Sequence, residues 1–391
     1  MRIRTPVLVS AVLLLGLPGP AQGQRDQGRQ AVRIGVVVDG PAERLQRSLE
    51  IIQKEVIAVN RSGHQVSFPP HSTIVSDYTP GNIRAALDRL LNDPEVDLVL
   101  AHGPLASHDL VTRQSLAKPA LAPFIINQRV QILAGPGGEL KRKNLSYVVW
   151  SMHIDRDLKA FRELGDFRKI AFIGGGHIGR SIGGLYEDLV AQAREQGVEM
   201  VPVAGEETAA AILRSVPDGV DAVYLGPNPR MSFAEVEKLA AGLVERKLPS
   251  FSWFGKEEVE KGILAGLGGP EDFIRLSRRI ALNVQRILQG EAPEELTTAF
   301  KLTEQLVLNM STARAVGVWP DFAVLSDAVL LGTRRKKVAR TLTIHSAIEE
   351  AMKANLELKA ADQGLLSGEE EIRRARSNLL PQLGLSANHR T

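Results

Sequence analysis

Short apolar runs alternate with amphipathic stretches along most of the chain. In the first half the apolar runs are VRIGVVV (32–38), QVSF (65–68), VDLVLA (96–101), ALAPFII (120–126) and LSYVVW (145–150). Helical patterns lie between them, one over 42–61 and one that begins at Pro80 with Thr79 as its N-cap. Nearly continuous apolar runs are typical of strands buried on both faces. The pattern therefore predicts a parallel sheet flanked by helices.

The same alternation starts again after residue 168. It predicts strands at 169–173, 198–203, 220–225, 250–254 and 263–267, and helices at 185–196, 209–214, 233–246 and 271–290. Ser232, followed by Glu235 three residues later, forms a capping-box pattern that fixes the start of the third of these helices. One more strand at 306–310 and a segment to 331 complete the pattern. We therefore expect an α/β fold with two similar lobes and a cleft between them: lobe 1 at 31–150, lobe 2 at 151–290, and a crossover that returns to lobe 1 at 291–331.

Both ends of the chain depart from the α/β pattern. Residues 1–23 begin with Arg2 and Arg4, continue with an apolar run over 7–17 and end on Ala-Gln-Gly. This is typical of a secretory signal peptide cleaved near Gly23, and the apolar run is short of the about 20 residues that a membrane span needs. At the other end, residues 332–341 are a basic linker and 342–391 form a helical tail. We therefore expect a protein that is exported from the cytoplasm.

The composition narrows the class of protein further. The chain has 391 residues, which is room for at least two domains, and it has no cysteine. Disulfides, a lipid-modified N-terminal cysteine and thiolate metal sites are thereby excluded, so a hydrophobic core must hold the fold. A formal net charge of +3 and a low aromatic content do not indicate a nucleic-acid partner.

The glycine-rich stretch IAFIGGGHIGRSIGG (170–184) contains two motifs of known enzymes. Gly174, Gly176 and Gly179 satisfy G-x-G-x-x-G between a predicted strand and a helix, as in dinucleotide sites. The acidic residue that should hold the ribose is misplaced, because Glu199 stands at the start of the next strand and not at its end. A nicotinamide cofactor is also unexpected in a secreted protein.

The second motif in this stretch is G-x-S-x-G around Ser181. In hydrolases the serine stands directly at the strand end, but Ser181 lies eight residues beyond Ile173, and no histidine occurs between His177 and His345. Two other interpretations remain open. The loop binds a carboxylate or phosphate at a helix N-terminus, with Gly176 and Ser181 as ligand-binding candidates, or its glycines only allow close packing. We expect no catalytic residue and no cofactor.

Other candidates follow predicted strand ends, where ligands bind in open parallel sheets. His102 follows VDLVLA, and we predict a polar cleft residue there, because a metal site with His108 needs a third ligand that the sequence does not offer. The remaining cleft candidates are Asp39, Asn127, Asn228, Arg230 and Trp253. The polar ones are also compatible with turns or caps, and Trp253 with the core.

From Val32 to Leu331 the chain resembles the substrate-binding proteins of ABC transporters in their two-lobed periplasmic form, a family that includes tryptophan and tyrosine uptake candidates. The segments that carry the resemblance are IGVVVDGP, YVVW, VDAVYLGPNPRM, LPSFSWFGKEEVEKGILAGLGGPEDF and VLNMSTARAVGVWPDFAVLSDAVLL. The resemblance implies a periplasmic-binding-protein-like fold with parallel sheets flanked by helices. It also implies a periplasmic location, capture of a small amino-acid-like or anionic ligand by lobe closure, without catalysis, and a transporter permease as partner.

The tail LTIHSAIEEAMKANLELKAADQGLLSGEEEIRRARSNLLPQLGLSAN is similar to the opening helix of TolC-type outer-membrane efflux proteins, which leads into a first barrel strand. This likeness implies an alternative function, as an N-terminal sensor or accessory region of a TolC-type efflux protein in the outer membrane, with efflux components as partners. A barrel strand without its neighbours leaves its hydrogen bonds unmade. The sequence therefore predicts a truncated efflux segment in a fragment or fusion.

Overall fold

The computed structural model describes residues 30–132, 140–269, 271–296, 298–333, 343–379 and 389. It has two compact units, Met1–Thr333 and Arg334–Thr391. The predicted signal peptide and most of the basic linker lie outside the described residues. Within the described part of the chain, no helix combines the length and the apolar character needed to cross a membrane.

The first sheet has the strand order β12-β6-β5-β4-β1-β2, with β3 also paired to β1, and all its pairs are parallel. Its strands are β1 (Gln30–Val38), β2 (His64–Ser67), β3 (Thr73–Val75), β4 (Leu98–His102), β5 (Ala120–Ile125), β6 (Leu145–Val149) and β12 (Thr298–Ala299). Helices α1 (Glu43–Asn60), α2 (Pro80–Asn92), α3 (Pro104–Thr112) and α4 (Gln128–Gln131) connect them, with a short 3₁₀ turn at Pro70–Ser72. We call this part lobe 1. Its central strands are buried on both faces, as the apolar runs predict.

The second sheet has the order β14-β13-β11-β10-β9-β7-β8 and defines lobe 2. Its strands are β7 (Lys169–Gly175), β8 (Glu199–Gly205), β9 (Ala222–Leu225), β10 (Ser250–Ser252), β11 (Ala265–Leu267), β13 (Leu306–Asn309) and β14 (Val329–Leu331). The pairs are parallel except for β11 with β13. Phe172, Tyr224 and Phe251 stack across the central strands, with ring centroids 5.9 and 5.8 Å apart. The Tyr224 hydroxyl donates at 2.7 Å to buried Asp157, which lies in the first helix of this lobe, so the bond ties that helix to the sheet.

The helices of lobe 2 are α5 (Ile154–Arg162), α6 (Gly176–Ser181), α7 (Leu185–Glu195), α8 (Ala209–Ser215), α9 (Phe233–Glu245), α10 (Lys256–Val259), α12 (Met310–Val316) and α13 (Phe322–Asp327). Helix α9 begins after Ser232, as predicted, and the Ser232 hydroxyl accepts the Glu235 N–H. The predicted capping box also requires the Glu235 carboxylate to accept the Ser232 N–H. Instead, this carboxylate accepts the Ala209 N–H at 2.7 Å. This bond ties the start of α8 to the start of α9.

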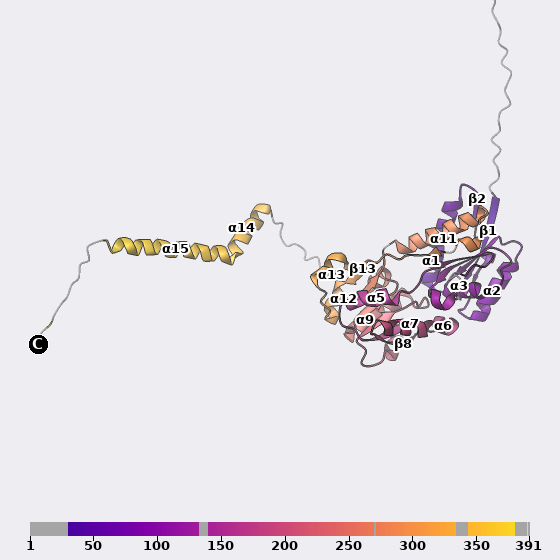
Figure 1. Ribbon diagram of the computed structural model, residues 1–391, viewed down its shortest axis with the longest axis horizontal. Coiled ribbons are helices and arrows are strands. Elements are labelled where there is room, and N and C mark those ends of the chain that lie inside the picture. The colour runs from indigo at the N-terminus through magenta and orange to yellow at the C-terminus, as the bar shows by residue number, and fades with distance from the viewer. Residues whose placement is uncertain are drawn as a thin grey trace, which may run out of the picture. The chain divides into compact units, whose positions relative to one another are not determined.

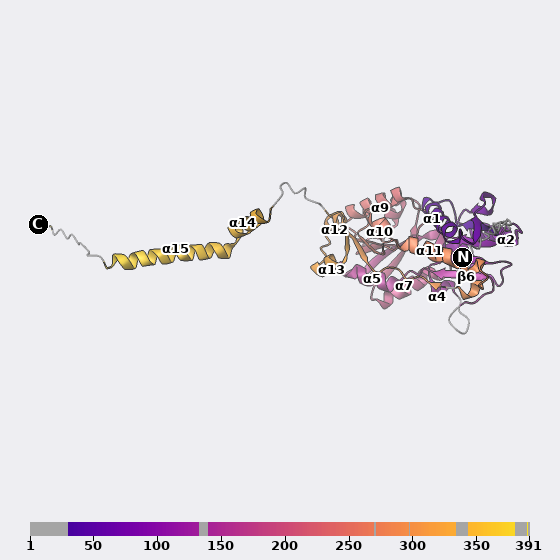
Figure 2. The same cartoon turned by 90° about the horizontal axis from the view of Figure 1, so that it is seen from above.

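The predicted lobe boundary at residue 290 needs correction. Helix α11 (Asp272–Leu288) lies beside α1 of lobe 1 (Figures 1 and 2), because its apolar face, which includes Leu276 and Ile280, is buried there. Asn283 holds it to lobe 1 by donating to the Leu296 carbonyl at 2.9 Å. Of the predicted return segment 291–331, β12 does join the first sheet, but β13 and β14 extend the second. Within the described residues the chain thus passes between the sheets three times: after β6, after β11 and after β12.

The second unit contains α14 (Ile344–Ala354) and α15 (Leu356–Ser377). The predicted helical stretch of the tail is therefore divided at Asn355, while α15 continues through Gly364 and Gly368. Thr343 and Ser346 form a capping box at the start of α14. The strand-like segment from residue 380 lies outside the described residues, apart from residue 389, so the predicted barrel strand stays a prediction.

Candidate ligand-binding cleft

A cleft of about 660 Å³ lies between the two lobes. Lobe 1 contributes the first turns of α1, the loop after β4 and the ends of β5 and β6. Lobe 2 contributes the segments after β9, β10 and β11, and the start of α11 completes the wall. Carboxyl ends of parallel strands from both sheets therefore meet at this cleft, which is the place where open α/β sheets bind ligands.

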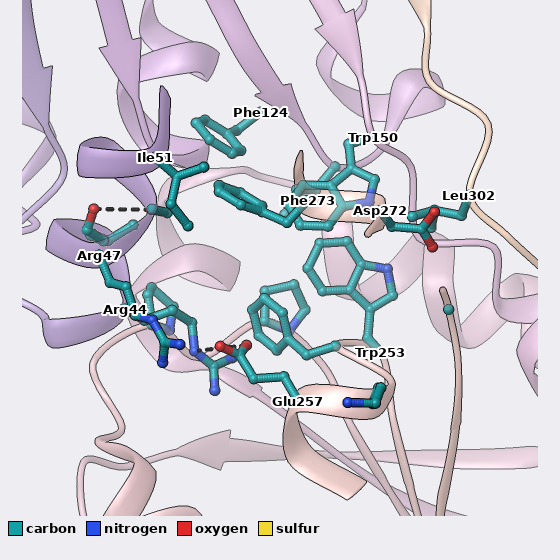
Figure 3. Close-up of a pocket in the computed structure, with 18 of the residues that line it drawn as sticks. Arg44, Arg47, Ile51, Phe124, Trp150, Trp253, Glu257, Asp272, Phe273 and Leu302 are labelled. Atoms are coloured by element: carbon teal, nitrogen blue, oxygen red, sulfur yellow. Dashed lines mark hydrogen bonds and ion pairs between the residues drawn. The ribbon is translucent and has the colours of Figure 1, made fainter. Parts of the chain in front are cut away.

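Aromatic side chains form the centre of the cleft (Figure 3). Trp150 and Trp253 lie with their ring centroids 4.8 Å apart, one from each lobe. Phe124 and Phe273 lie 6.2 and 6.3 Å from Trp150, and Phe254 lies 4.9 Å from Trp253. Ring pairs at these separations attract one another beyond simple burial, and they leave apolar faces for a flat ligand.

A buried ion pair joins the two lobes beside these rings. Arg44 at the start of α1 donates from Nη2 to Glu258 Oε1 on α10 at 2.9 Å. The other oxygen of Glu258 accepts the Ser252 hydroxyl at 2.6 Å. The Arg44 guanidinium also lies over the Phe254 ring, 3.9 Å from its centroid, and Glu257 Oε2 is 3.8 Å from Arg44 Nε. Burial raises the pKa of Glu257, in part against the effect of Arg44.

Asp272, at the start of α11, is fully occupied by protein donors. One of its oxygens accepts the backbone N–H groups of Gly269 (2.7 Å) and Thr303 (3.2 Å). The other accepts Arg275 Nη1 at 2.6 Å and the Thr303 hydroxyl at 2.7 Å. These bonds fix the segment that crosses from lobe 2 to lobe 1, so Asp272 positions the wall of the cleft.

Of the eight candidate residues predicted from the sequence, Trp253 lines the cleft, and the other seven are not among its lining residues. Asp39 follows β1 and accepts the N–H groups of Leu105 (2.9 Å) and Ala106 (2.8 Å) at the start of α3. Burial raises the pKa of Asp39 to about 7, although these two bonds lower it. Asp39 therefore caps a helix directly behind the lobe-1 wall.

His102 also lies behind the wall. Its ring is edge-on to Phe124 at 5.1 Å, and its Nε2 lies 2.9 Å from both the Leu45 carbonyl and the Ser48 hydroxyl. Burial lowers the pKa of His102 to about 4, so the ring is neutral at pH 7. No group of three metal-binding side chains occurs in the part of the chain that the structure describes.

Two of the other candidates make contacts between the lobes. Asn127 caps α4 by accepting the Val130 N–H at 3.1 Å, and its Nδ2 donates to Asp188 of α7 at 2.8 Å. Arg230 of lobe 2 pairs with Glu207 and lies 5.3 Å from the centroid of the Tyr78 ring of lobe 1. Asn228 stays within lobe 2, where its Nδ2 donates to the Glu206 carbonyl at 3.0 Å. Asn127 therefore has the helix-capping role that the sequence analysis left open for it, at the start of α4.

The glycine-rich loop packs around Tyr186. A Cβ added at Gly174 or at Gly179 would lie 2.5 or 2.4 Å from atoms of this side chain. The Tyr186 hydroxyl donates to the Gly175 carbonyl at 2.6 Å. These contacts favour the close-packing interpretation of the glycines. Gly176 begins α6, Ser181 ends it, and neither lines the cleft.

Sequence reasoning missed most of the residues that form the cleft. Trp150 follows β6 directly, so the rule that selected Trp253 would have found it. Phe124 lies inside the apolar run of β5, and Arg44 and Phe273 lie on helices. Local patterns do not mark such positions as different from ordinary core or surface residues.

Comparison with solved structures decides the fold class. A conserved domain protein from Vibrio cholerae matches with a TM-score of 0.61 at 18% identity, over 77% of this chain and 99% of that one. A domain from Streptococcus pneumonia in complex with L-Trp matches with a TM-score of 0.62 at 18% identity and the same coverage of both chains. The chain has the two-lobed fold of periplasmic solute-binding proteins.

A third structure of this fold is the ligand-free, open form of a substrate-binding protein with adhesive properties from Clostridium difficile. It matches with a TM-score of 0.51 at 15% identity, over 77% of this chain and 99% of that one. No family model matches the chain. A search of curated proteins also found no significant match.

Proposed function

We propose that this protein is the solute-binding protein of an ABC transporter and holds a small ligand in the cleft between its lobes. The observation that carries the proposal is a cleft of about 660 Å³ whose aromatic walls come from both lobes. Pockets for small molecules are typically of this size and largely apolar, with a few polar groups that orient the ligand. A ligand that packs against both Trp150 and Trp253 contacts both lobes at once, and so it favours the closed arrangement.

The proposed mechanism is a shift between open and closed populations. A ligand that touches both lobes binds the closed form more tightly, and it shifts the equilibrium by that difference in affinity. The three crossings of the chain between the sheets are where we expect the hinge. A permease would then recognise the closed form, and we place the protein in the periplasm, in accordance with its fold.

The contacts in the cleft support binding and not catalysis. Ser48 lines the cleft and lies 2.9 Å from His102 Nε2, which is the spacing of a nucleophile and its base. That nitrogen must carry a proton to donate to the Leu45 carbonyl, so it cannot take one from the Ser48 hydroxyl. The other ring nitrogen, Nδ1, has no partner in the described protein, and thus no acid orients the ring.

A ligand screen tests the proposal. We expect at least one compound from a panel of aromatic and aliphatic acids, amino acids and amines to raise the melting temperature of the full chain. A ligand at a hundred times its Kd stabilises a protein by about 2.7 kcal/mol. Trp253→Ala should remove the shift, whereas Trp319→Ala, at a side chain that is 73% exposed and outside the cleft, should keep it. A folded protein that no compound stabilises, or a shift that survives Trp253→Ala, contradicts the proposal.

The tail favours a second candidate, an accessory region of a TolC-type efflux protein. Helix α14 exposes Ile344, Ile348 and Met352, which are spaced four residues apart and so share one face. An exposed apolar stripe of this kind indicates a contact with another helix. If the tail attaches the protein to an outer-membrane component, the full chain should fractionate with outer membranes, and a chain ending at residue 333 should not. Under the first proposal, removal of the tail leaves ligand binding unchanged.

A further inference from the structure

The buried side-chain atoms of the cleft that lack a hydrogen-bond partner, among the described residues, are all donors. Among the lining residues, four buried side-chain atoms have no hydrogen-bond partner in the described protein: Arg44 Nε and Nη1, Trp150 Nε1 and Trp253 Nε1. Arginine and the indole ring can only donate. A buried donor that stays unpaired costs about 1–3 kcal/mol, so a ligand that supplies acceptors to these atoms is favoured.

The acidic groups of the cleft are either occupied or at its solvent side. Both oxygens of Asp272 already accept two donors each. Glu260 pairs with Lys256. Glu257 is 40% exposed and faces Arg44, and Glu43 is exposed. The interior of the cleft therefore offers no free carboxylate, among the described residues, to receive an ammonium group.

The donors lie on two sides of the aromatic cluster. Figure 3 shows Arg44 at one side and the two tryptophans at the other, with aromatic rings between them. The Arg44 guanidinium donates to Glu258 through Nη2, and its Nε and Nη1 groups remain as charged donors for a carboxylate oxygen. The indole N–H groups at the far side are suited to a hydroxyl or carbonyl oxygen. The ring of the ligand would lie among Phe124, Trp150, Trp253 and Phe254.

We infer that the cleft selects aromatic carboxylates that carry a second oxygen acceptor on the ring side, and that an α-ammonium group contributes nothing to their binding. The inference rests on the solute-binding function proposed above and names the ligand class for that same cleft. The carboxylate binds Arg44, the ring packs among the aromatic side chains, and the distal oxygen accepts from Trp150 or Trp253. A zwitterionic amino acid would bring its ammonium to a place where, among the described lining residues, no carboxylate is free to pair with it.

Three compounds with one skeleton separate the roles of the two groups. Isothermal titration calorimetry on the full chain would use 3-(4-hydroxyphenyl)propionate, L-tyrosine and tyramine. We expect the acid without an amino group to bind at least as tightly as L-tyrosine, and tyramine to bind at least tenfold more weakly. L-tyrosine binding tenfold more tightly than the acid, or tyramine binding as well as the acid, overturns the inference.

The same experiment distinguishes the inference from the function on which it rests. If none of the three compounds binds but another solute of the screening panel does, the ligand class is wrong and the solute-binding function stands. If the folded protein binds no solute at all, both are wrong.

Removing the indole N–H while keeping an aromatic ring tests the donor role directly. Trp150→Phe and Trp253→Phe are each expected to weaken the hydroxylated acid, by roughly tenfold where the hydrogen bond is made. The same variants should weaken 3-phenylpropionate, which lacks the ring oxygen, clearly less, because that acid loses only ring packing and no hydrogen bond. Trp319→Phe is the matched control and should change neither affinity. An equal loss for both acids in both cleft variants would show that the tryptophans act only through packing, and would overturn the donor assignment.

Discussion

The buried pair of Arg44 and Glu258 is expected to hold the lobes together, so Glu258→Gln should open them. The side chains are 9% and 5% exposed, and they come from α1 of lobe 1 and α10 of lobe 2. Glutamine keeps the shape of the side chain but removes its charge. In the closed form the buried Arg44 guanidinium then loses its hydrogen-bonded anion and keeps only Glu257, whose Oε2 lies 3.8 Å from Arg44 Nε, whereas in an open form it returns to water.

The expected change in the free energy of the closed form follows from the burial of this ion pair. Removing one partner of a buried ion pair costs about 3–5 kcal/mol, since the other charge is left uncompensated. Glu257, whose Oε2 lies 3.8 Å from Arg44 Nε, still compensates part of the charge in the variant, so the loss should fall below this range. A net loss of about 2–3 kcal/mol in the closed form alone corresponds to a change of roughly 30-fold to 150-fold in the closed-to-open ratio.

The distance between two spin labels measures this ratio. The chain contains no cysteine, so Lys54→Cys on α1 and Ala241→Cys on α9 would place one label on each lobe without further changes. We expect Glu258→Gln to add a longer distance, or to replace the short one, in pulsed electron paramagnetic resonance. Glu291→Gln breaks a matched arginine–glutamate pair whose side chains are 46% and 43% exposed, and it should leave the distance unchanged. An unchanged distance in Glu258→Gln would refute the view that this pair holds the lobes.

Three further predictions concern the fold. Burial raises the pKa of Asp39 from its ordinary value of 3.8 to about 7, so between these pH values the native state binds a proton that the unfolded state does not. The free energy of unfolding should therefore fall as pH rises from about 4 to 7. Urea titrations should show that the free energy of unfolding of Asp39→Asn depends less on pH. Gly179→Ala should cost about 1–3 kcal/mol in thermal unfolding, because its Cβ meets Tyr186, whereas Gly183→Ala has open space and should have little effect; equal losses would contradict the packing role. Deletion of residues 334–391 should leave the melting temperature of the first unit unchanged, since the two units are separately compact, and a lowered value would contradict this.

The sequence predicted the positions of those strands that are buried on both faces. Strands such as β4 and β5 are apolar on both faces, and their runs are too short for a buried helix and are bounded by turn residues. Their positions agree with the prediction to within about two residues. Helix α11 was also predicted as an element, but its lobe was assigned wrongly. Its apolar stripe specifies that it must be covered, and nothing in the stripe specifies by which sheet.

The residues of the cleft were harder to predict from the sequence than the helices and strands, because most of them come together only in the tertiary structure. Trp253 was found because a residue after a parallel strand reaches the carboxyl edge of a sheet, which is a local consequence of strand direction. The pairing of Arg44 with Glu258 joins residues 214 positions apart, and no periodicity relates them. The sequence by itself determined two sets of buried parallel strands and the helices that cover them, because alternation and burial are local properties. Only the tertiary structure decided which side chains from the two lobes meet in the cleft, because that depends on how the three crossings bring the two sheet edges together.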